Sequence, residues 1–296
     1  MTATVTLKND RMQVDLAPDF GGRITRLIDL TTGRDWLVPG PCEGDVSDAA
    51  TYGGAQARGW DECFPTVAPC AMSPRDHGDI WGRAVSSQTD ANSVTMTYEG
   101  PNFRFERQIT LDGNRLLVTY AASNTGVAPM SFMWSQHCLL NLNSDDRIGI
   151  TGVGPFAVTG VLGQPAPAPT QFVWPLFDAV RPDLSHVESI GAGWAMKAYA
   201  QVSDTARAQV DGPTGGITFT WSGAEISTLG LWLDYGGWPD TQPNHQVAIE
   251  PTTAPADDLN SAADQMSERW VGPNETARWS VEISLTPPEN LQGEDK

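Results

Sequence analysis

The chain of 296 residues carries 36 acidic and 18 basic side chains, which give a formal net charge of −18 and a pI near 4.4. A net field of that sign repels phosphate, so it argues against nucleic acid or an anionic membrane as a partner. No stretch approaches the ~18 consecutive apolar residues of a membrane-spanning helix, and residues 1–10 lack the basic and apolar regions of a signal peptide. We therefore expect a cytoplasmic protein.

The sequence contains no recognisable metal or cofactor motif. Its four cysteines are unevenly spaced without a CxxC pair, and no HxH or HExxH pattern joins its four histidines. The glycine pairs match neither a phosphate-binding loop nor a dinucleotide-binding fingerprint, and no nucleophile elbow is present. We expect free, reduced cysteines, no metal and no cofactor.

The hydrophobic pattern of the N-terminal half is typical of β-strands. Residues 4–7 and 12–16 predict a hairpin and residues 23–30 a further strand, whereas residues 39–59 show no period and predict a long loop. Apolar and polar residues then alternate along three runs separated by turn sequences. This alternation predicts an antiparallel meander with strands at 93–98, 103–111 and 116–120.

The C-terminal half continues in the same way. Further strands are predicted at 193–201, 208–210, 217–221, 228–234, 246–250 and 276–285, and the Pro/Ala-rich stretch 164–170 predicts a surface loop. No amphipathic helix longer than about two turns is evident. The sequence thus predicts an all-β protein of large stacked antiparallel sheets, with one domain over residues 1–286 and a polar tail at 287–296.

Two strand-like segments, LGLWLDYGGWP and VAIEPTT, each carry a carboxylate near the end, Asp234 and Glu250. Because side chains alternate across a strand, Glu250 should face away from the aliphatic pair of its own segment. Pro251 cannot donate a ladder hydrogen bond and is expected to end the strand. In the turn after Asp234, Trp238 is placed to cover a sugar ring. The alternative is a hairpin with two solvent-facing acids.

Two histidines lie in unusual surroundings. His77 belongs to RDHGDIWGR, where glycine lets a ligand approach the backbone closely, although a surface turn explains it equally well. His137 lies on the mostly apolar stretch WSQHCLLNL, where a satisfied core histidine is the commoner outcome. His186 and His245 lie in polar stretches and are expected to be solvated.

A third cluster, RGWDECFPT, places two acids side by side. Adjacent residues of an extended chain face opposite ways, so at most one of Asp61 and Glu62 can point into a given cleft. A charged loop edge with Trp60 in the core is the alternative. One carboxylate and one or two histidines among tryptophans suit proton transfer on a sugar.

Taken in order, the motifs GWDECFPT, DHGDIWGR, WSQHCLLNL, LGLWLDYGGWP and VAIEPTTAPADDL resemble those of the aldose 1-epimerase (galactose mutarotase) superfamily. The resemblance covers the span from about Arg58 to Leu259, and the earlier GGRITRL is similar to the N-terminal strands of the family. It implies a large antiparallel β-supersandwich with few short helices. It also implies an isomerase without a cofactor that opens and recloses a sugar ring at the anomeric carbon.

The resemblance further implies roles for particular residues. Glu250 would take the proton of the anomeric hydroxyl as the base, and His137 would protonate the ring oxygen as the acid. His77 and Asp234 match positions that hold or polarise sugar hydroxyls. The expected activity is that of a mutarotase, which interconverts the α and β anomers of a hexose or related aldose.

The sequence departs from the best-known members of the family at two places. QHCLLNL replaces an Asn-His-x-Tyr-Phe-Asn-Leu type of segment, and GWDECFPT is similar to a less-characterised branch. Arg58, Glu62 and Arg83 are therefore candidates for contacting a substituent that galactose lacks, such as an anionic group.

Alternative functions stay open at this point. One is an epimerase of a phosphorylated or sulfonated sugar, which would need converging arginines. Another is a non-catalytic carbohydrate-binding protein on the same scaffold. A hydrolase or lyase with Asp234 as second carboxylate has less support. In each case the partner is a small-molecule sugar, and the chain is expected to be a monomer or a homodimer.

Overall fold

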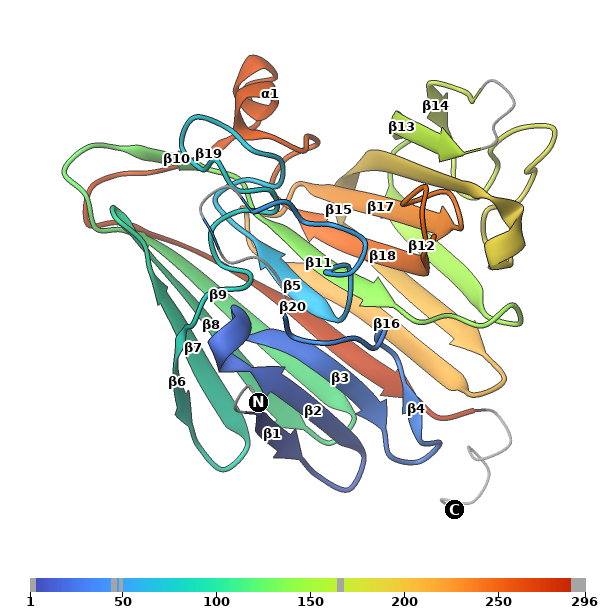
Figure 1. Ribbon diagram of the computed structural model, residues 1–296, viewed down its shortest axis with the longest axis horizontal. Coiled ribbons are helices and arrows are strands. Elements are labelled where there is room, and N and C mark those ends of the chain that lie inside the picture. The colour runs from blue at the N-terminus through green and yellow to red at the C-terminus, as the bar shows by residue number, and fades with distance from the viewer. Residues whose placement is uncertain (1–3, 44–46, 48–49, 164–167, 289–296) are drawn as a thin grey trace.

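A computed structural model describes residues 4–43, 47, 50–163 and 168–288 of the chain (Figure 1). The first of its two large sheets is antiparallel and runs in the spatial order β1–β2–β3–β5–β11–β18–β17–β15–β13–β14, with β4 paired to β3. Its strands are β1 Val5–Lys8, β2 Met12–Ala17, β3 Arg23–Asp29, β4 Arg34–Asp35, β5 Trp60–Cys63, β11 Ser135–Leu140, β13 Phe156–Gly163, β14 Gln171–Phe172, β15 Trp194–Gly212, β17 Thr228–Tyr235 and β18 His245–Thr252.

The second sheet is also antiparallel, in the order β6–β7–β8–β9–β20–β16–β15–β12. Its remaining strands are β6 Ser86–Thr89, β7 Ser93–Glu99, β8 Phe103–Asp112, β9 Arg115–Asn124, β12 Arg147–Val153, β16 Gly215–Ser222 and β20 Thr276–Thr286. A small pair, β10 Met130–Phe132 with β19 Arg269–Val271, stands apart from both sheets. Helical structure among the described residues is limited to α1 Leu259–Asp264 and two short 3-10 turns, Pro18–Phe20 and Ile190–Ala192.

The core lies between the two sheets. In β8 the buried residues alternate with exposed or half-buried ones, so that Phe103, Phe105, Ile109 and Leu111 point inward. Such alternation lets a strand bury one face while the other meets solvent. Trp279 of β20 adds aromatic packing at the centre. Burial of these apolar surfaces, at about 25 cal/mol per Å², is the main force that holds the sheets together.

Strand β15 joins the two sheets. Its first half, Ala195 to Gln201, pairs with β17 in the first sheet, and its second half, Arg207 to Gly212, pairs with β16 in the second. The sequence pattern predicted two separate strands at 193–201 and 208–210, and this prediction was wrong because one continuous strand of 19 residues crosses between the layers. The all-β supersandwich itself is confirmed.

Two further expectations need correction. Strand β18 does not end before Pro251 but continues to Thr252, because Glu250 and Thr252 stay paired with Gly230 and Thr228, so the missing donor removes one ladder hydrogen bond at most. His245 begins this strand and bonds the carbonyl of Glu188, so it is not a solvated loop residue.

Several predicted segments extend beyond the described residues. Most of the predicted tail (289–296), part of the loop 39–59 (44–46 and 48–49) and part of the loop 164–170 (164–167) lie outside them, and the single-domain boundary stays a prediction. No helix within the described ranges is long and apolar enough to cross a membrane.

Candidate active site

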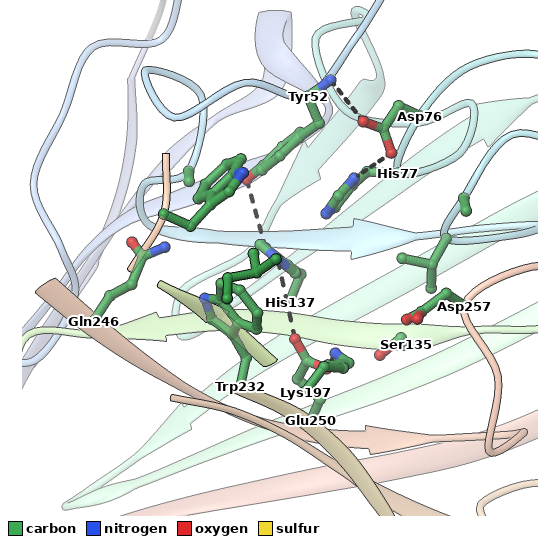
Figure 2. Close-up of a pocket in the computed structure, with 15 residues that line it drawn as sticks. Tyr52, Asp76, His77, Ser135, His137, Lys197, Trp232, Gln246, Glu250 and Asp257 are labelled. Carbon is green, nitrogen blue, oxygen red and sulfur yellow. Dashed lines mark hydrogen bonds and ion pairs between the residues drawn. The ribbon is translucent and has the colours of Figure 1, made fainter. Parts of the chain in front are cut away.

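A cavity of about 310 Å³ lies on the face of the first sheet that points away from the second sheet. Figure 1 shows the blue-to-cyan loops that follow β4 and β5 lying over β5 and β11. These loops contribute Tyr52, Asp76 and His77 to the cavity lining. Figure 2 shows the side chains that line it. Its polar lining residues are Tyr52, Asp76, His77, Ser135, His137, Lys197, Gln246, Glu250 and Asp257, and Trp232 and Trp238 form an aromatic wall.

The alternation of β18 places its polar residues in this cavity. Val247 and Ile249 are fully buried in the core between the sheets, whereas Gln246 and Glu250 line the cavity on the opposite face. This confirms the predicted orientation of Glu250. The outcome follows from the two-residue period of a strand, which separates an apolar face from a functional one.

Glu250 is 1% exposed and is held on one side only. Its Oε2 accepts a charge-assisted hydrogen bond from the Nζ of Lys197, whereas its Oε1 has no hydrogen-bond partner within the described part of the chain. Burial raises the pKa of Glu250, and the charge of Lys197 acts against this rise. The free oxygen is therefore a strong acceptor that faces the cavity.

His137, on the neighbouring strand β11, faces the same space. Its Nε2 lies 4.0 Å from Oε1 of Glu250, and the residue is 9% exposed. Burial lowers the pKa of His137 well below its ordinary value, and the nearby charges of His77, Lys197 and Arg23 lower it further. Burial and these charges therefore favour the neutral form of the imidazole.

Behind His137 runs a buried chain of polar groups. Arg23 binds Asp61 through two nitrogens, with Nε 2.9 Å from Oδ1 and Nη2 2.5 Å from Oδ2. Tyr52 donates its hydroxyl hydrogen to Oδ2 of Asp61 at 2.8 Å, and the same hydroxyl lies 3.5 Å from Nδ1 of His137. Of the two adjacent acids in β5, Asp61 is therefore the one on the cavity side.

This chain selects the tautomer of His137. A hydroxyl has one hydrogen, and the shorter bond, which runs to Oδ2 of Asp61, takes it. The oxygen of Tyr52 can then only accept from His137, so the neutral ring carries its hydrogen on Nδ1 and turns the lone pair of Nε2 toward the cavity. Two acceptors, Nε2 of His137 and Oε1 of Glu250, thus face each other across 4.0 Å.

His77 closes the site from the loop that follows β5. Its Nδ1 lies 2.8 Å from Oδ1 of Asp76, and its ring stacks on Tyr52 with centroids 4.0 Å apart. Gly78 allows this placement, because a Cβ there would lie 2.4 Å from the carbonyl oxygen of Phe64. Only glycine at position 78 lets the backbone of this loop pack directly against the backbone of Phe64 at the end of β5.

The aromatic wall consists of Trp232 of β17 and Trp238 of the turn that follows. Both are half-buried, with ring centroids 6.3 Å apart and planes at 82°. Trp238 lines the cavity, and its contact with a sugar ring stays a prediction. Trp232 was missed because it lies between Leu231 and Leu233 in a segment whose composition is typical of a core strand. Gln246 lies nearby in Figure 2, and its buried Oε1 has no hydrogen-bond partner among the described residues.

Asp234 does not line the cavity. Its Oδ1 accepts hydrogen bonds from the backbone N–H groups of Gly236, Gly237 and Trp238 at 3.0–3.2 Å. Burial raises its pKa to about 7, although these three donors lower it. The residue holds the turn that presents Trp238, and its contact with a sugar hydroxyl stays a prediction.

The three residues predicted to contact an anionic substituent are also not among the described residues that line the cavity. Glu62 is buried on the core side of β5, where it bonds Arg107 at 2.8 Å, because neighbouring strand residues face opposite ways. Arg58 donates to the carbonyls of Gly54 and Ala57 and to Asn244, and Arg83 donates to Tyr98. The expectation for Glu62 is wrong, because its carboxylate is held in the core by Arg107, Tyr120 and Trp134. A substrate contact of Arg58 or Arg83 stays a prediction.

Lys197 is the main residue that the sequence reasoning missed. A signal existed, since the 18 basic side chains comprise 15 arginines and only three lysines, Lys8, Lys197 and Lys296. Lys197 interrupts the apolar stretch WAMKAYA in the middle of a predicted strand, where a charged residue needs a buried partner. Tyr52 gave no such signal because it lies in an irregular loop.

The described residues contain no group of three or more His, Cys, Asp or Glu side chains arranged to hold a metal ion. The cavity instead joins a carboxylate, an imidazole and an ammonium group from three strands of one sheet, β18, β11 and β15. Such a set can move protons between oxygen atoms of a bound hydroxylated molecule.

Comparison with solved structures identifies the fold. The chain superimposes on the Slr1438 protein of Synechocystis with a TM-score of 0.70 and 16% identity over 97% of this chain and 96% of that one. It matches a galactose mutarotase related enzyme of Lactobacillus acidophilus with a TM-score of 0.69 and 13% identity, covering 97% and 98% of the two chains. An aldose epimerase homologue of C. elegans gives 0.66 and 11%, covering 98% and 100%.

No family model matches the sequence, and neither does any curated protein. The three solved structures cover almost the whole chain, but their identities define the architecture alone. The chain therefore has the galactose mutarotase-like fold that its motifs predicted.

Proposed function

We propose that the protein is a mutarotase that interconverts the anomers of an uncharged aldose. The observation that carries this proposal is the pair Glu250 and His137, whose Oε1 and Nε2 face one cavity 4.0 Å apart, with Oε1 lacking a hydrogen-bond partner among the described residues. Opening a pyranose requires removal of a proton from the anomeric hydroxyl and addition of one to the ring oxygen. An acid and a base on adjacent strands suit these two atoms, which are bonded to the same carbon.

In this scheme the pair carries one proton. When His137 is protonated on Nε2 and Glu250 is ionised, the carboxylate takes the hydroxyl proton while the imidazolium protonates the ring oxygen. The open-chain aldehyde rotates about its C1–C2 bond, and reclosure with the roles reversed gives the other anomer. No atom is gained or lost, and no cofactor is needed.

The environment strengthens both partners. Burial raises the pKa of Glu250, which makes its carboxylate a better base than an exposed one. Burial and neighbouring charges lower the pKa of His137, which makes its imidazolium a stronger acid toward the weakly basic ring oxygen. Both shifts move the shared proton from His137 toward Glu250, and the forward and reverse reactions use both forms of the pair.

The charges that line the cavity favour an uncharged sugar over a phosphorylated or sulfonated one. Three described lining residues are acidic, Asp76, Glu250 and Asp257, whereas Lys197 is the one basic residue among the described lining and is paired with Glu250. Recognition of an anionic group normally uses arginine, and no arginine belongs to this lining.

Two other functions have less support. Glycoside hydrolysis needs two carboxylates on either side of the scissile bond, and Asp234, the expected second one, serves the turn before Trp238. A pure carbohydrate-binding protein would need the aromatic wall but neither the buried ion pair of Lys197 and Glu250 nor a tautomer-selecting chain behind His137.

The test is anomer exchange followed by NMR on a panel of neutral and phosphorylated aldoses. We expect wild-type protein to accelerate exchange of a neutral aldose, and Glu250→Gln and His137→Asn each to lower kcat/KM by about 10²–10⁴-fold. Matched controls are Glu99→Gln and His186→Asn, whose exposed side chains lie outside the cavity lining, and both should retain wild-type rates.

Three results would count against the proposal. Wild-type protein that binds a sugar without accelerating its exchange would indicate a binding protein instead. Full activity of both Glu250→Gln and His137→Asn would show that this pair is not the acid and base of the reaction. A clear preference for phosphorylated sugars would contradict the argument from charge.

A further inference from the structure

The hydrogen bond between Lys197 and Glu250 crosses an intervening strand. Lys197 lies on β15 and Glu250 on β18, and both strands pair with β17, which lies between them. The ammonium group holds Oε2, while Oε1 points toward His137 and the cavity. Figure 2 shows the side chains of Lys197 and Glu250 meeting below the ring of His137.

The intervening strand makes room for this contact with a glycine. Gly230 of β17 is the direct cross-strand neighbour of Glu250. A Cβ at this position would lie 2.9 Å from Oε2 of Glu250 and 3.1 Å from the ring of Tyr199. Any side chain at position 230 would therefore displace the carboxylate. Oε2 of Glu250 occupies the space that Gly230 leaves free, and the Nζ of Lys197 holds it there.

The surroundings make Lys197 the main cation near this carboxylate. Burial alone would lower the pKa of Lys197, but the charges of Glu250 and Asp257 outweigh it, so the pKa is raised and the side chain stays charged. The other titratable groups that interact electrostatically with Glu250 are His137 and Cys138 of β11, Cys63 of β5, Tyr199 of β15, and His77 and Asp257 of the loops.

We propose that Lys197 is a positioning residue, which fixes Glu250 through Oε2 over Gly230 and so makes Oε1 the oxygen that exchanges protons with the substrate. The inference rests on the proposed mutarotase function. Lys197 has a second effect in this arrangement, because its positive charge favours the form of the Glu250–His137 pair with fewer protons. The effect of Lys197 on the orientation of Glu250 and the effect of its charge on the Glu250–His137 pair can be tested with different variants.

Lys197→Met removes the charge and keeps much of the side-chain volume. Without a nearby cation both members of the pair bind protons more readily, so both limbs of the bell-shaped plot of kcat/KM against pH should move to higher pH. On the acidic side of the optimum we expect kcat/KM to fall by about 10- to 100-fold. Lys197→Arg keeps a charge and should return both limbs toward their original pH.

Gly230→Ala tests orientation without altering any charge. The added methyl should displace the Glu250 carboxylate, lowering the maximum of the pH profile by about 10-fold or more while both limbs stay in place. Lys8→Met is the matched control for Lys197→Met, since Lys8 is exposed at the end of β1. It should leave the maximum and both limbs of the pH profile unchanged. Near-UV circular dichroism checks that each variant keeps its tertiary structure.

A measurement without catalysis separates this inference from the proposed function. The carboxyl carbon of Glu250, labelled with ¹³C and assigned by its absence in Glu250→Gln, should titrate at higher pH in Lys197→Met than in wild type or Lys8→Met. An unchanged titration, or a Lys197→Met profile equal to wild type in height and position, would overturn the role of Lys197. If no sugar is turned over, the proposed function fails, and the carbon titration still decides whether Lys197 controls Glu250.

Discussion

His137 and Glu250 face each other from adjacent antiparallel strands, with Nε2 of the imidazole 4.0 Å from Oε1 of the carboxylate. That separation is too long for a direct hydrogen bond. Each residue is bonded from behind instead, His137 by Tyr52 and Glu250 by Lys197. The two reactive atoms are therefore oriented by other groups and left open to a bound molecule.

Tyr52→Phe should lower kcat by about 10- to 100-fold with little change in KM. The hydroxyl fixes the tautomer of His137, and its loss leaves Nδ1 without its acceptor while Arg23 still holds Asp61. Anomer exchange gives the rate, and ¹⁵N NMR of the imidazole reports the tautomer directly. Tyr98→Phe removes a hydroxyl outside the cavity lining and serves as the control. An unchanged ratio of tautomers in Tyr52→Phe would contradict the proposed chain.

Trp232→Ala should weaken sugar binding, raising KM by about 5- to 20-fold while kcat changes less. The indole forms part of the aromatic wall, and its removal exposes one side of a bound ring to water. Trp270→Ala is the matched control, because that side chain is 62% exposed and lies outside the lining. Equal KM values for the two variants would remove Trp232 from the binding surface.

Glu62→Gln should reduce the free energy of unfolding by about 3 kcal/mol and leave KM unchanged. The carboxylate neutralises Arg107 in the core and also accepts from Tyr120 and Trp134, so the variant leaves a buried cation uncompensated. Urea denaturation measures the loss. Glu106→Gln, in an exposed pair with Arg104, should not shift the midpoint. A raised KM together with an unchanged free energy of unfolding would instead indicate that Glu62 contacts the sugar.

Asp234→Asn should make stability less dependent on pH. The pKa of Asp234 is raised to about 7 in the folded chain, so the folded state binds its proton more tightly than the unfolded state does. That contribution is fully present below the ordinary pKa of aspartate and is lost as the pH rises through about 7. Asn keeps an oxygen for the three N–H donors and does not titrate.

The variant should therefore gain stability relative to wild type between pH 4 and pH 8, by on the order of 1 kcal/mol after allowance for solvent screening. Urea denaturation at both pH values measures the difference. Parallel changes in the two proteins would show that Asp234 titrates in the folded chain as it does in the unfolded one.

Part of the site could be predicted because it depends on local geometry. The period of β18 places Glu250 opposite Val247 and Ile249 in any sheet that buries the aliphatic face, so its orientation followed from the sequence. The same rule stated that Asp61 and Glu62 face opposite ways. It did not say which of them faces the cavity, because that depends on which layer covers each face of β5.

The sequence by itself determined the all-β class, the antiparallel pattern and the location of Glu250, His137, His77 and Trp238 in distinctive motifs. Only the tertiary structure decided that Lys197 bonds Glu250, that Tyr52 stands behind His137, and that Arg58 and Arg83 bond elsewhere. The physical reason is that these partners lie far apart along the chain, on strands and loops that meet only when the sheet forms. Hydrophobic periodicity specifies the face of a strand, whereas the choice of neighbours belongs to the topology.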